Sequence, residues 1–327
     1  MKKKTILTIV ILAAAVLALL FAGLPLFSRL YYGRSQAATL FAWQLHKERY
    51  TTEEAFQEYL TEKRAENAEP YLLPLDEEPE TDAVPIVRGG MAGYALHPNG
   101  ARLILYFAGG SYIDQPRAVH WQFLSQLAED TDAAVVVPIY PKLPDSDAAA
   151  AYEALTDFCR ELLADGSWDE LIFMGDSAGG GMALSLAMQL RDAGAEGPDK
   201  LILICPWLDV TLSNPDIPAY EKKDPALDSE QLRHLGALWA GDLSPTDPVV
   251  SPLYGHFEDL GTITLITGTG ELLYPDIMAL DDLLTREGIP HDTYTARGMF
   301  HVWPLYVAYD IPETQAAYSQ IVHTVTR

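Results

Sequence analysis

One serine of this 327-residue chain has the sequence context of a catalytic nucleophile. Ser177 lies in G-D-S-A-G at 175–179, between an apolar run and an Ala/Leu/Met-rich segment. A G-x-S-x-G pattern between a strand and a helix is typical of a nucleophile elbow, in which glycines relieve the crowding of a strained turn. An ordinary glycine-rich turn is the alternative, and a phosphate-binding loop is disfavoured because no G-K-[ST] follows. The pattern predicts Ser177 as the nucleophile.

A base must accompany this serine, because a hydroxyl is a poor nucleophile at neutral pH. After such an elbow the acid and then the histidine are expected later in the chain, each following a late strand. His301 lies in a glycine-bearing loop between the last predicted strand and the last predicted helix, and we predict it as the general base; a surface histidine is the alternative. The other histidines lie at less suitable positions: His46, His97, His120, His234, His256, His291 and His323.

Two carboxylates follow the predicted strand at 262–267. Glu271 lies close to the carboxyl end of that strand, whereas Asp276 is better placed as the N-cap of the next helix. We therefore predict Glu271 as the acid that orients His301, with Asp276 as the alternative. A glutamate can hold the imidazole tautomer and stabilise the imidazolium, although its arm is longer than that of aspartate.

Donors for an oxyanion are expected in the loop A-G-G-S-Y at 108–112, directly after the predicted strand at 102–107. Its glycines let backbone amides approach a developing negative charge, and the amide of Ala178 is the donor on the elbow side. A tight turn without a catalytic part is the alternative. The loop and the elbow together predict an oxyanion hole.

These residues are spaced by an alternation of apolar, strand-like runs and helical segments. Such alternation predicts an α/β fold with a mostly parallel sheet covered by helices on both faces. We expect strands at 92–96, 102–107, 133–139, 170–174, 200–204, 262–267 and 292–295. We expect helices near 116–129, 146–163, 178–192, 277–287 and 312–324.

Two segments fall outside this alternation and are predicted to form a cap. Residues 210–248 are rich in Pro, Asp and charged residues, with a helix expected near 231–239. An insertion at the carboxyl ends of strands is well placed to cover a site. Residues 31–83 contain one or two further helices, with a capping signal at 51–54, and an acidic linker. The catalytic domain is therefore expected at 84–327, with the cap insertion at 210–248.

The amino-terminal residues 1–30 are predicted to be a signal anchor that forms a transmembrane helix. Three lysines precede an apolar run that extends from residue 6 to residue 22 and continues to 27. This run reaches the roughly 20 residues that span a bilayer, and no clean Ala-x-Ala cleavage site ends it. The lysines predict a cytoplasmic start and an extracytoplasmic catalytic domain, although Arg29 and Arg34 weigh against this orientation. Secretion after signal cleavage is the alternative.

Composition narrows the possible partners. The formal charge of −24 argues against nucleic acid as a partner and favours a neutral or cationic substrate over a polyanionic one. The two cysteines, Cys159 in a predicted helix and Cys205 in a predicted strand, are expected to be buried thiols rather than a disulfide. The predicted chemistry needs no metal and no organic cofactor.

Over residues 84–327 the chain resembles the hormone-sensitive-lipase-like branch of the α/β-hydrolases, which includes many bacterial carboxylesterases. Y-F-A-G-G-S-Y at 106–112 stands in place of the family's Y-x-H-G-G-G-[YF], and G-D-S-A-G-G at 175–180 matches its elbow. P-W-L-D at 206–209, S-P-L at 251–253 and G-M-F-H at 298–301 match in the same order. Several independent motifs in one order make this resemblance specific.

The resemblance implies that Ser177 is the nucleophile, Glu271 the acid and His301 the base. It also implies an oxyanion hole formed by the backbone amides of Gly110, Ser111 and Ala178. The chain departs from the family pattern at three positions. Ala108 replaces the histidine of the family motif, Ser111 replaces its third glycine, and Glu271 stands where aspartate is commoner. None of them removes a group that the mechanism requires, because the donors are backbone amides.

The sequence thus predicts a serine hydrolase, with a carboxylesterase for short- to medium-chain acyl or acetyl esters as the first hypothesis. The same residues would serve an amidase, a peptidase or an acyltransferase, since the leaving group and the access of water decide among these reactions. A ligand-binding module without activity is the alternative from another class.

Overall fold

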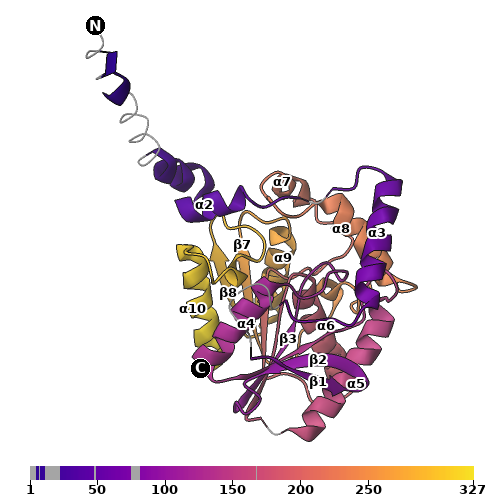
Figure 1. Cartoon of the computed structure of the whole chain (residues 1–327). Coiled ribbons are helices and arrows are strands. Elements are labelled where there is room, and N and C mark those ends of the chain that lie inside the picture. Colours follow the sequence, from indigo (N-terminus) through magenta and orange to yellow (C-terminus); the bar gives the residue numbers. More distant parts are fainter. Residues whose placement is uncertain (1–4, 7, 12–22, 48, 75–81, 167) are drawn as a thin grey trace.

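The computed structural model describes residues 5–6, 8–11, 23–47, 49–74, 82–166 and 168–327. A central sheet of eight strands is covered by helices on both faces (Figure 1). The strands are β1 (Val84–Arg88), β2 (Met91–Leu96), β3 (Arg102–Phe107), β4 (Ala134–Pro138), β5 (Glu170–Asp176), β6 (Lys200–Ile204), β7 (Thr262–Gly268) and β8 (His291–Ala296). The α/β-hydrolase fold class that the sequence predicts is confirmed.

The strands follow the order β1-β2-β4-β3-β5-β6-β7-β8. The six strands from β4 to β8 pair in parallel, and β1 and β2 are antiparallel to their neighbours. The central strands consist almost entirely of buried apolar residues, as strands covered on both faces require. The strand β1 was not expected, because V-P-I-V-R is short and contains a proline that only an edge position tolerates.

Two helix layers bury the two faces of the sheet, and each layer has its own apolar core. Figure 1 shows α4 and α10 on one side of the sheet and α5 on the other. The bounds of these covering helices are α4 (Ala118–Thr131), α5 (Ala148–Asp165), α6 (Ala178–Asp192), α9 (Tyr274–Glu287) and α10 (Pro312–Thr326).

The remaining helices gather at the carboxyl ends of the parallel strands, where the predicted cap was expected (Figure 1). They comprise the π-helical turn η1 (Ser28–Tyr32), α2 (Gln36–Ala42), α3 (Glu53–Ala68), α7 (Ile217–Glu221) and α8 (Ser229–Ala240). The short 3-10 turns are η2 (Pro252–Tyr254) and η3 (Trp303–Leu305). Thr52 caps α3, since its side chain accepts a hydrogen bond from the amide of Ala55 at 3.2 Å. The five-residue α7 was not predicted, because a proline and few apolar residues leave it little periodic signal.

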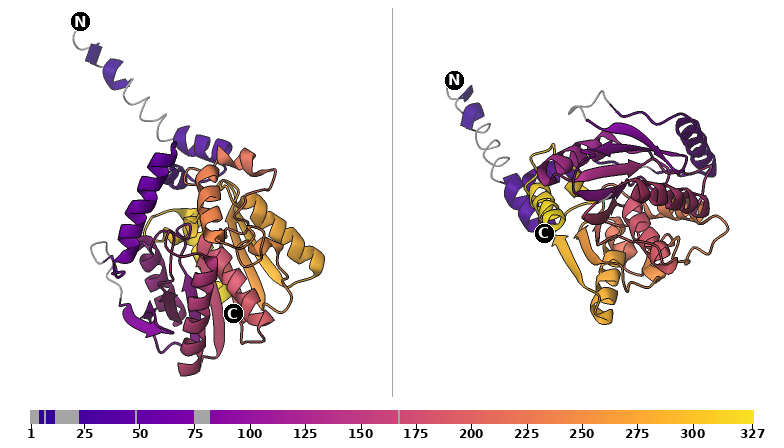
Figure 2. Two further views of the ribbon diagram at one scale, coloured as in Figure 1. Left: turned by 90° about the vertical axis from the view of Figure 1, so that its right-hand side faces the viewer. Right: turned by 90° about the horizontal axis from the view of Figure 1, so that it is seen from below.

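The amino-terminal helices rest against the last helix of the chain. Ser35 caps α2, and its Oγ donates a hydrogen bond to Glu313 of α10 at 2.7 Å. The right-hand view of Figure 2 shows α10 beside these amino-terminal helices. The predicted membrane-spanning run depends on residues 12–22, which lie outside the described residues. Within the described part of the chain, none of the helices combines the length and the apolar character that crossing a bilayer requires.

Candidate active site

The elbow between β5 and α6 brings Ser177 to the carboxyl edge of the sheet. Ser177 has φ +52° and ψ −123°, a strained combination for a residue other than glycine. The flanking glycines permit this turn because the chain packs closely there. A Cβ on Gly175 would lie 2.3 Å from the Gly179 carbonyl oxygen, and a Cβ on Gly179 would lie 1.9 Å from the Phe107 carbonyl oxygen. The two glycines therefore explain the G-x-S-x-G spacing physically.

Three predicted site residues lie in one chain of hydrogen bonds. The Nε2 atom of His301 lies 2.8 Å from the Oγ of Ser177. The Nδ1 atom of His301 lies 2.7 Å from Oε2 of Glu271. All three side chains are buried, so they are largely withdrawn from water. This is the geometry in which a carboxylate orients an imidazole and the imidazole accepts the hydroxyl proton.

Glu271 is held by the end of the strand that delivers it. Its Oε1 accepts hydrogen bonds from the Oγ1 of Thr267 at 2.7 Å and from the amide of Gly268 at 3.0 Å. Its Oε2 is thereby left for His301. Burial disfavours the imidazolium, but the hydrogen bond and the charge of Glu271 outweigh burial, and the pKa of His301 is raised above its ordinary value.

Asp276, the alternative acid, occupies a different environment. The helix α9 begins at Tyr274 with Leu273 as its N-cap, so the expectation that Asp276 caps this helix is wrong. Pro275 suits the first turn of a helix, and the helix consequently starts before Asp276. The carboxylate of Asp276 is buried and has no hydrogen bond of normal geometry with the described residues. Burial raises its pKa to about 7, against the effect of the nearby Asn214.

The predicted oxyanion loop is strained and has free donors. Gly110, Ser111 and Tyr112 have φ values of +125°, +52° and +62°. Among the described residues, the amides of Gly110, Ser111 and Ala178 donate to no protein acceptor. Gly110 and Ser111 also line the cavity beside Ser177. Backbone amides in such a position are suited to bind a developing oxyanion.

The aspartate of the elbow fixes this loop, a function that the motif alone did not reveal. Oδ1 of Asp176 accepts hydrogen bonds from the amide of Gly109 at 2.9 Å and from the hydroxyl of Tyr106 at 2.7 Å. Its Oδ2 lies 3.5 Å from Nε2 of His120. Burial would raise the pKa of Asp176, but these partners, His120 first, outweigh burial and lower it. His120 precedes the elbow in the chain, and only the fold brings it to the site.

A second buried carboxylate joins the cap insertion to the acid loop. Oδ2 of Asp224 accepts a hydrogen bond at 2.7 Å from the amide of Leu272, the residue after Glu271. Its Oδ1 accepts from the amides of Ala226 and Leu227 at 2.7 and 2.9 Å. Burial raises the pKa of Asp224, although these donors and His301 oppose that rise. Nothing distinguished Asp224 from the other acidic residues of the insertion.

Cys205 was expected within a strand, but it lies just after β6, beside the loop that carries His301. It directly follows β6 with φ +48°, and its Sγ accepts a hydrogen bond from the amide of Val302 at 3.3 Å. Ligand atoms of Cys205, Glu271 and His301 lie within 4.8 Å of one another, so these three side chains could approach one metal ion. Glu271 and His301 are already bonded to each other, and both cysteines are free thiols.

A cavity of about 200 Å³ borders Ser177 and His301. Its walls come from the segment after α2, from the cap insertion and from the loop after His301, and they include Leu45, Leu227, Leu232, Val302 and Leu305. This volume is below the roughly 300–1,000 Å³ of typical pockets for drug-sized ligands. The cavity thus offers a small and partly apolar space next to the serine.

Comparison with known proteins agrees with this architecture. Residues 104–305 match the alpha/beta hydrolase fold family. An acetyl-hydrolase of Streptomyces hygroscopicus is 31% identical over 206 residues, which are 63% of this chain and 69% of that protein. The crystal structure of a candidate esterase from Staphylococcus aureus has a TM-score of 0.82 at 26% identity, over 88% of this chain and 98% of the other. An esterase of the bacterial hormone-sensitive lipase family has a TM-score of 0.74 at 23% identity, over 89% and 96%.

Proposed function

Since this chain belongs to the α/β-hydrolase family and is a carboxylic ester hydrolase of the hormone-sensitive-lipase-like branch, we propose that it cleaves short-chain acyl esters through Ser177, His301 and Glu271. The observation that carries this proposal is the continuous line of hydrogen bonds from Ser177 through His301 to Glu271. Acetyl esters are the first candidates, because a relative is named an acetyl-hydrolase and the cavity beside Ser177 is small.

Acylation begins when Nε2 of His301 takes the proton of Ser177 as Oγ attacks the ester carbonyl carbon. The carbonyl π electrons move to oxygen, and Glu271 stabilises the imidazolium that forms. The C–O bond to the alcohol then breaks, and Nε2 of His301 gives its proton to the leaving oxygen. The products of this half-reaction are the free alcohol and an acyl group on Ser177.

Deacylation repeats these steps with water. His301 removes a proton from water, the resulting oxygen attacks the acyl carbon, and the proton returns to Oγ of Ser177 as the acid leaves. The amides of Gly110, Ser111 and Ala178 are the proposed donors to the oxyanion in both half-reactions. Asp176 supports this function by holding the loop through Gly109 and Tyr106.

The test is hydrolysis of p-nitrophenyl esters with acyl chains from two to twelve carbons, using the full chain in detergent. We expect the highest kcat/KM at two to four carbons. Ser177→Ala and His301→Ala should each lose at least about 10³-fold of the kcat of the parent. Full activity in either variant would contradict the proposed triad, and a maximum at long chains would contradict the preference for short acyl groups.

We also propose that the catalytic part lies outside the cytoplasm and is tethered through the apolar amino-terminal run. The supporting observation is the run from residue 6 to residue 27 after three lysines. Fractionation of cells that express the full chain tests this, with a variant lacking residues 1–34 as the control. The full chain should resist carbonate extraction and be cut by external protease. Its recovery in the carbonate supernatant would contradict the tether.

A further inference from the structure

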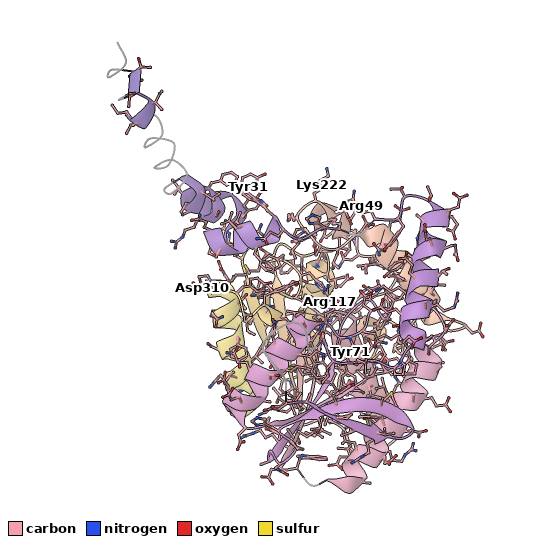
Figure 3. All side chains as sticks on the ribbon, in the orientation of Figure 1. Tyr31, Arg49, Tyr71, Arg117, Lys222 and Asp310 are labelled. Carbon is pink, nitrogen blue, oxygen red and sulfur yellow. The ribbon has the colours of Figure 1, made fainter. Side chains whose placement is uncertain are left out.

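A second hollow opens beside the candidate active site. This groove has a volume of about 530 Å³ and lies between the segment after α3 and the start of α4. Arg117, Val119 and Tyr306 line both the groove and the cavity at Ser177, so the two spaces adjoin along these side chains. Figure 3 labels Arg117 and Tyr71, which lie between the sheet and the helices α2, α7 and α8 in this view. The groove thus extends the site away from the serine.

The far wall of the groove is fixed to the body of the protein. The hydroxyl of Tyr71 donates to the carbonyl oxygen of Pro116 at 2.8 Å and accepts from Nε1 of Trp121 at 2.6 Å. The carbonyl oxygen of Tyr71 accepts from the hydroxyl of Tyr94 at 3.0 Å. Burial raises the pKa of Tyr71 to about 12, so its hydroxyl stays protonated and can make both bonds. The exposed Leu72 and the half-buried Pro74 add apolar surface to this wall.

The sizes of the two spaces indicate which half of an ester each would receive, because the smaller one borders Ser177 and the larger one lies farther from it. In the proposed reaction His301 gives its proton to the leaving oxygen, and the alcohol part therefore departs on the histidine side. Tyr306 follows His301 by five residues and forms part of the passage to the groove. The acyl part remains on Ser177, next to the cavity of about 200 Å³.

The charges at this passage are unequal. Of the acids that line the cavity, Asp114 is paired with Lys63 at 2.7 Å and Asp228 with Arg49 at 2.8 Å. Asp176 is buried among its own partners. Arg117, in contrast, is exposed and has no ion pair among the described residues. A cation without a partner at the junction favours a substrate with a negative charge at that point.

The groove itself is less favourable to anions along its length. Glu66 lies 2.8 Å from Lys63 but shares this lysine with Asp114, and Glu69 at the end of α3 has no ion pair within the described segments. A negative charge is therefore accommodated near Arg117 and not throughout the groove. This local preference differs from the neutral or cationic substrate that the overall charge of −24 suggests.

We propose that this groove binds the alcohol part of the ester substrate and that Arg117 recognises a single negative charge on it. The substrate class is then a short acyl ester of an elongated, largely apolar alcohol that has a carboxylate or similar anion a few bonds from the ester oxygen. This inference rests on the proposed function, since it assigns the second half of the same substrate.

The first experiment compares 4-acetoxybenzoate with its neutral amide, 4-acetoxybenzamide, on the full chain. We expect Arg117→Gln to lower the ratio of kcat/KM for the carboxylate substrate to kcat/KM for the amide substrate about 5-fold, which is the upper range for an exposed ion pair. Arg160→Gln is the matched control, because Arg160 is an exposed arginine on α5, and it should change the ratio less than about 2-fold. An unchanged ratio in Arg117→Gln would overturn the recognition of charge.

The second experiment probes the groove with 4-acetoxybiphenyl and phenyl acetate. Leu72→Ser should lower the preference for the longer alcohol about 3-fold, with Val87→Ser on β1 as the control. Both side chains are exposed, so neither change should impair folding. An unchanged preference would overturn the groove as the alcohol site. Failure of the parent to hydrolyse p-nitrophenyl acetate would instead contradict the proposed function. Turnover of p-nitrophenyl acetate without any turnover of 4-acetoxybenzoate, 4-acetoxybenzamide, 4-acetoxybiphenyl or phenyl acetate would contradict this inference.

Discussion

The thiol of Cys205 contacts the loop that carries His301, the proposed base. Val302 has φ +50°, which is unfavourable for a β-branched residue, and its amide donates to Sγ of Cys205. Burial raises the pKa of this thiol well above its ordinary value, so the group stays a neutral, unreactive thiol. The contact holds the backbone directly after His301 in a conformation that it would not otherwise favour.

Cys205→Ala should therefore reduce kcat about 10-fold with little change in KM, because the amide of Val302 loses its acceptor and His301 shifts. Cys205→Ser retains an acceptor and should stay within about 3-fold of the parent. Steady-state kinetics on p-nitrophenyl acetate measure both variants. Equal kcat values for the alanine variant and the parent would show that the thiol only fills space.

The two carboxylates after β7 should differ sharply in their effect on turnover. Glu271→Gln should lower kcat by about 10²- to 10⁴-fold, since glutamine neither fixes the imidazole tautomer nor stabilises the imidazolium. Asp276→Asn should leave kcat within about 3-fold, because Asp276 makes no hydrogen bond with His301. Equal losses, or the reverse order, would contradict the assignment of the acid.

The pH dependence of kcat/KM gives an independent measure of the same contact. The base must be neutral, and Glu271 raises the pKa of His301 above its ordinary value against the effect of burial. Activity should therefore fall as the pH drops, with a midpoint above that of an ordinary histidine. In Glu271→Gln the imidazolium loses its main support, so the midpoint of the residual activity should move to lower pH. A midpoint that does not move would contradict this coupling.

At the scale of elements, α9 contains a buried carboxylic acid whose ionisation the fold opposes. The pKa of Asp276 is about 7 in the folded chain and about 3.8 in the unfolded chain. Between these values the folded state binds more protons, so the free energy of unfolding decreases as the pH rises from about 4 to 7. Above pH 7 the full cost of the buried carboxylate is present.

Asp276→Asn should remove this loss and raise the free energy of unfolding at pH 8 by up to about 4 kcal/mol relative to the parent. At pH 4 the two proteins should be nearly equal. Urea unfolding at both pH values measures the difference, and Asp282→Asn, at an exposed position on the same helix, is the control. A gain at pH 8 no larger than that of the control would contradict the raised pKa of Asp276.

The elements that could be predicted are those whose sequence has a strong local pattern. The strand β3, the strand β6 and the helix α6 begin and end where the apolar runs and the elbow placed them. The edge strand β1 and the short α7 have weak patterns, because tertiary contacts decide their conformation. The helix α9 begins at Tyr274, earlier than predicted. The prediction used Asp276 as the N-cap, but Pro275 is equally suited to the first turn of a helix.

The candidate site divides in a similar way. Ser177, Glu271 and His301 follow strands in a known order, and the order allowed us to expect them together. His120, Asp224 and Cys205 have no comparable signal, because they reach the site through contacts between segments that are far apart in the chain. Only the fold brings these supporting residues to the proposed catalytic groups.

At the scale of the whole molecule, a hydrogen bond from Leu272 to Asp224 joins the loop after β7 to the cap insertion that covers the site. The sheet supplies Ser177 after β5 and Glu271 after β7, on either side of β6, and the cap insertion lines the cavity with Leu227 and Leu232. The overall charge of −24 surrounds a site whose acids are mostly paired or enclosed. Long-range repulsion of anions is screened by salt beyond about 10 Å, whereas contacts at Arg117 act at short range.

The hydrogen bond from the amide of Leu272 to Asp224 has a consequence for protein engineering. Exchanging the complete insertion with that of a relative would replace the acceptor that holds the backbone beside Glu271, so specificity and turnover would change together. Gln231 and Leu232 of α8 line the same cavity without that bond. Libraries restricted to these two positions should alter the choice of substrate while the catalytic geometry stays intact.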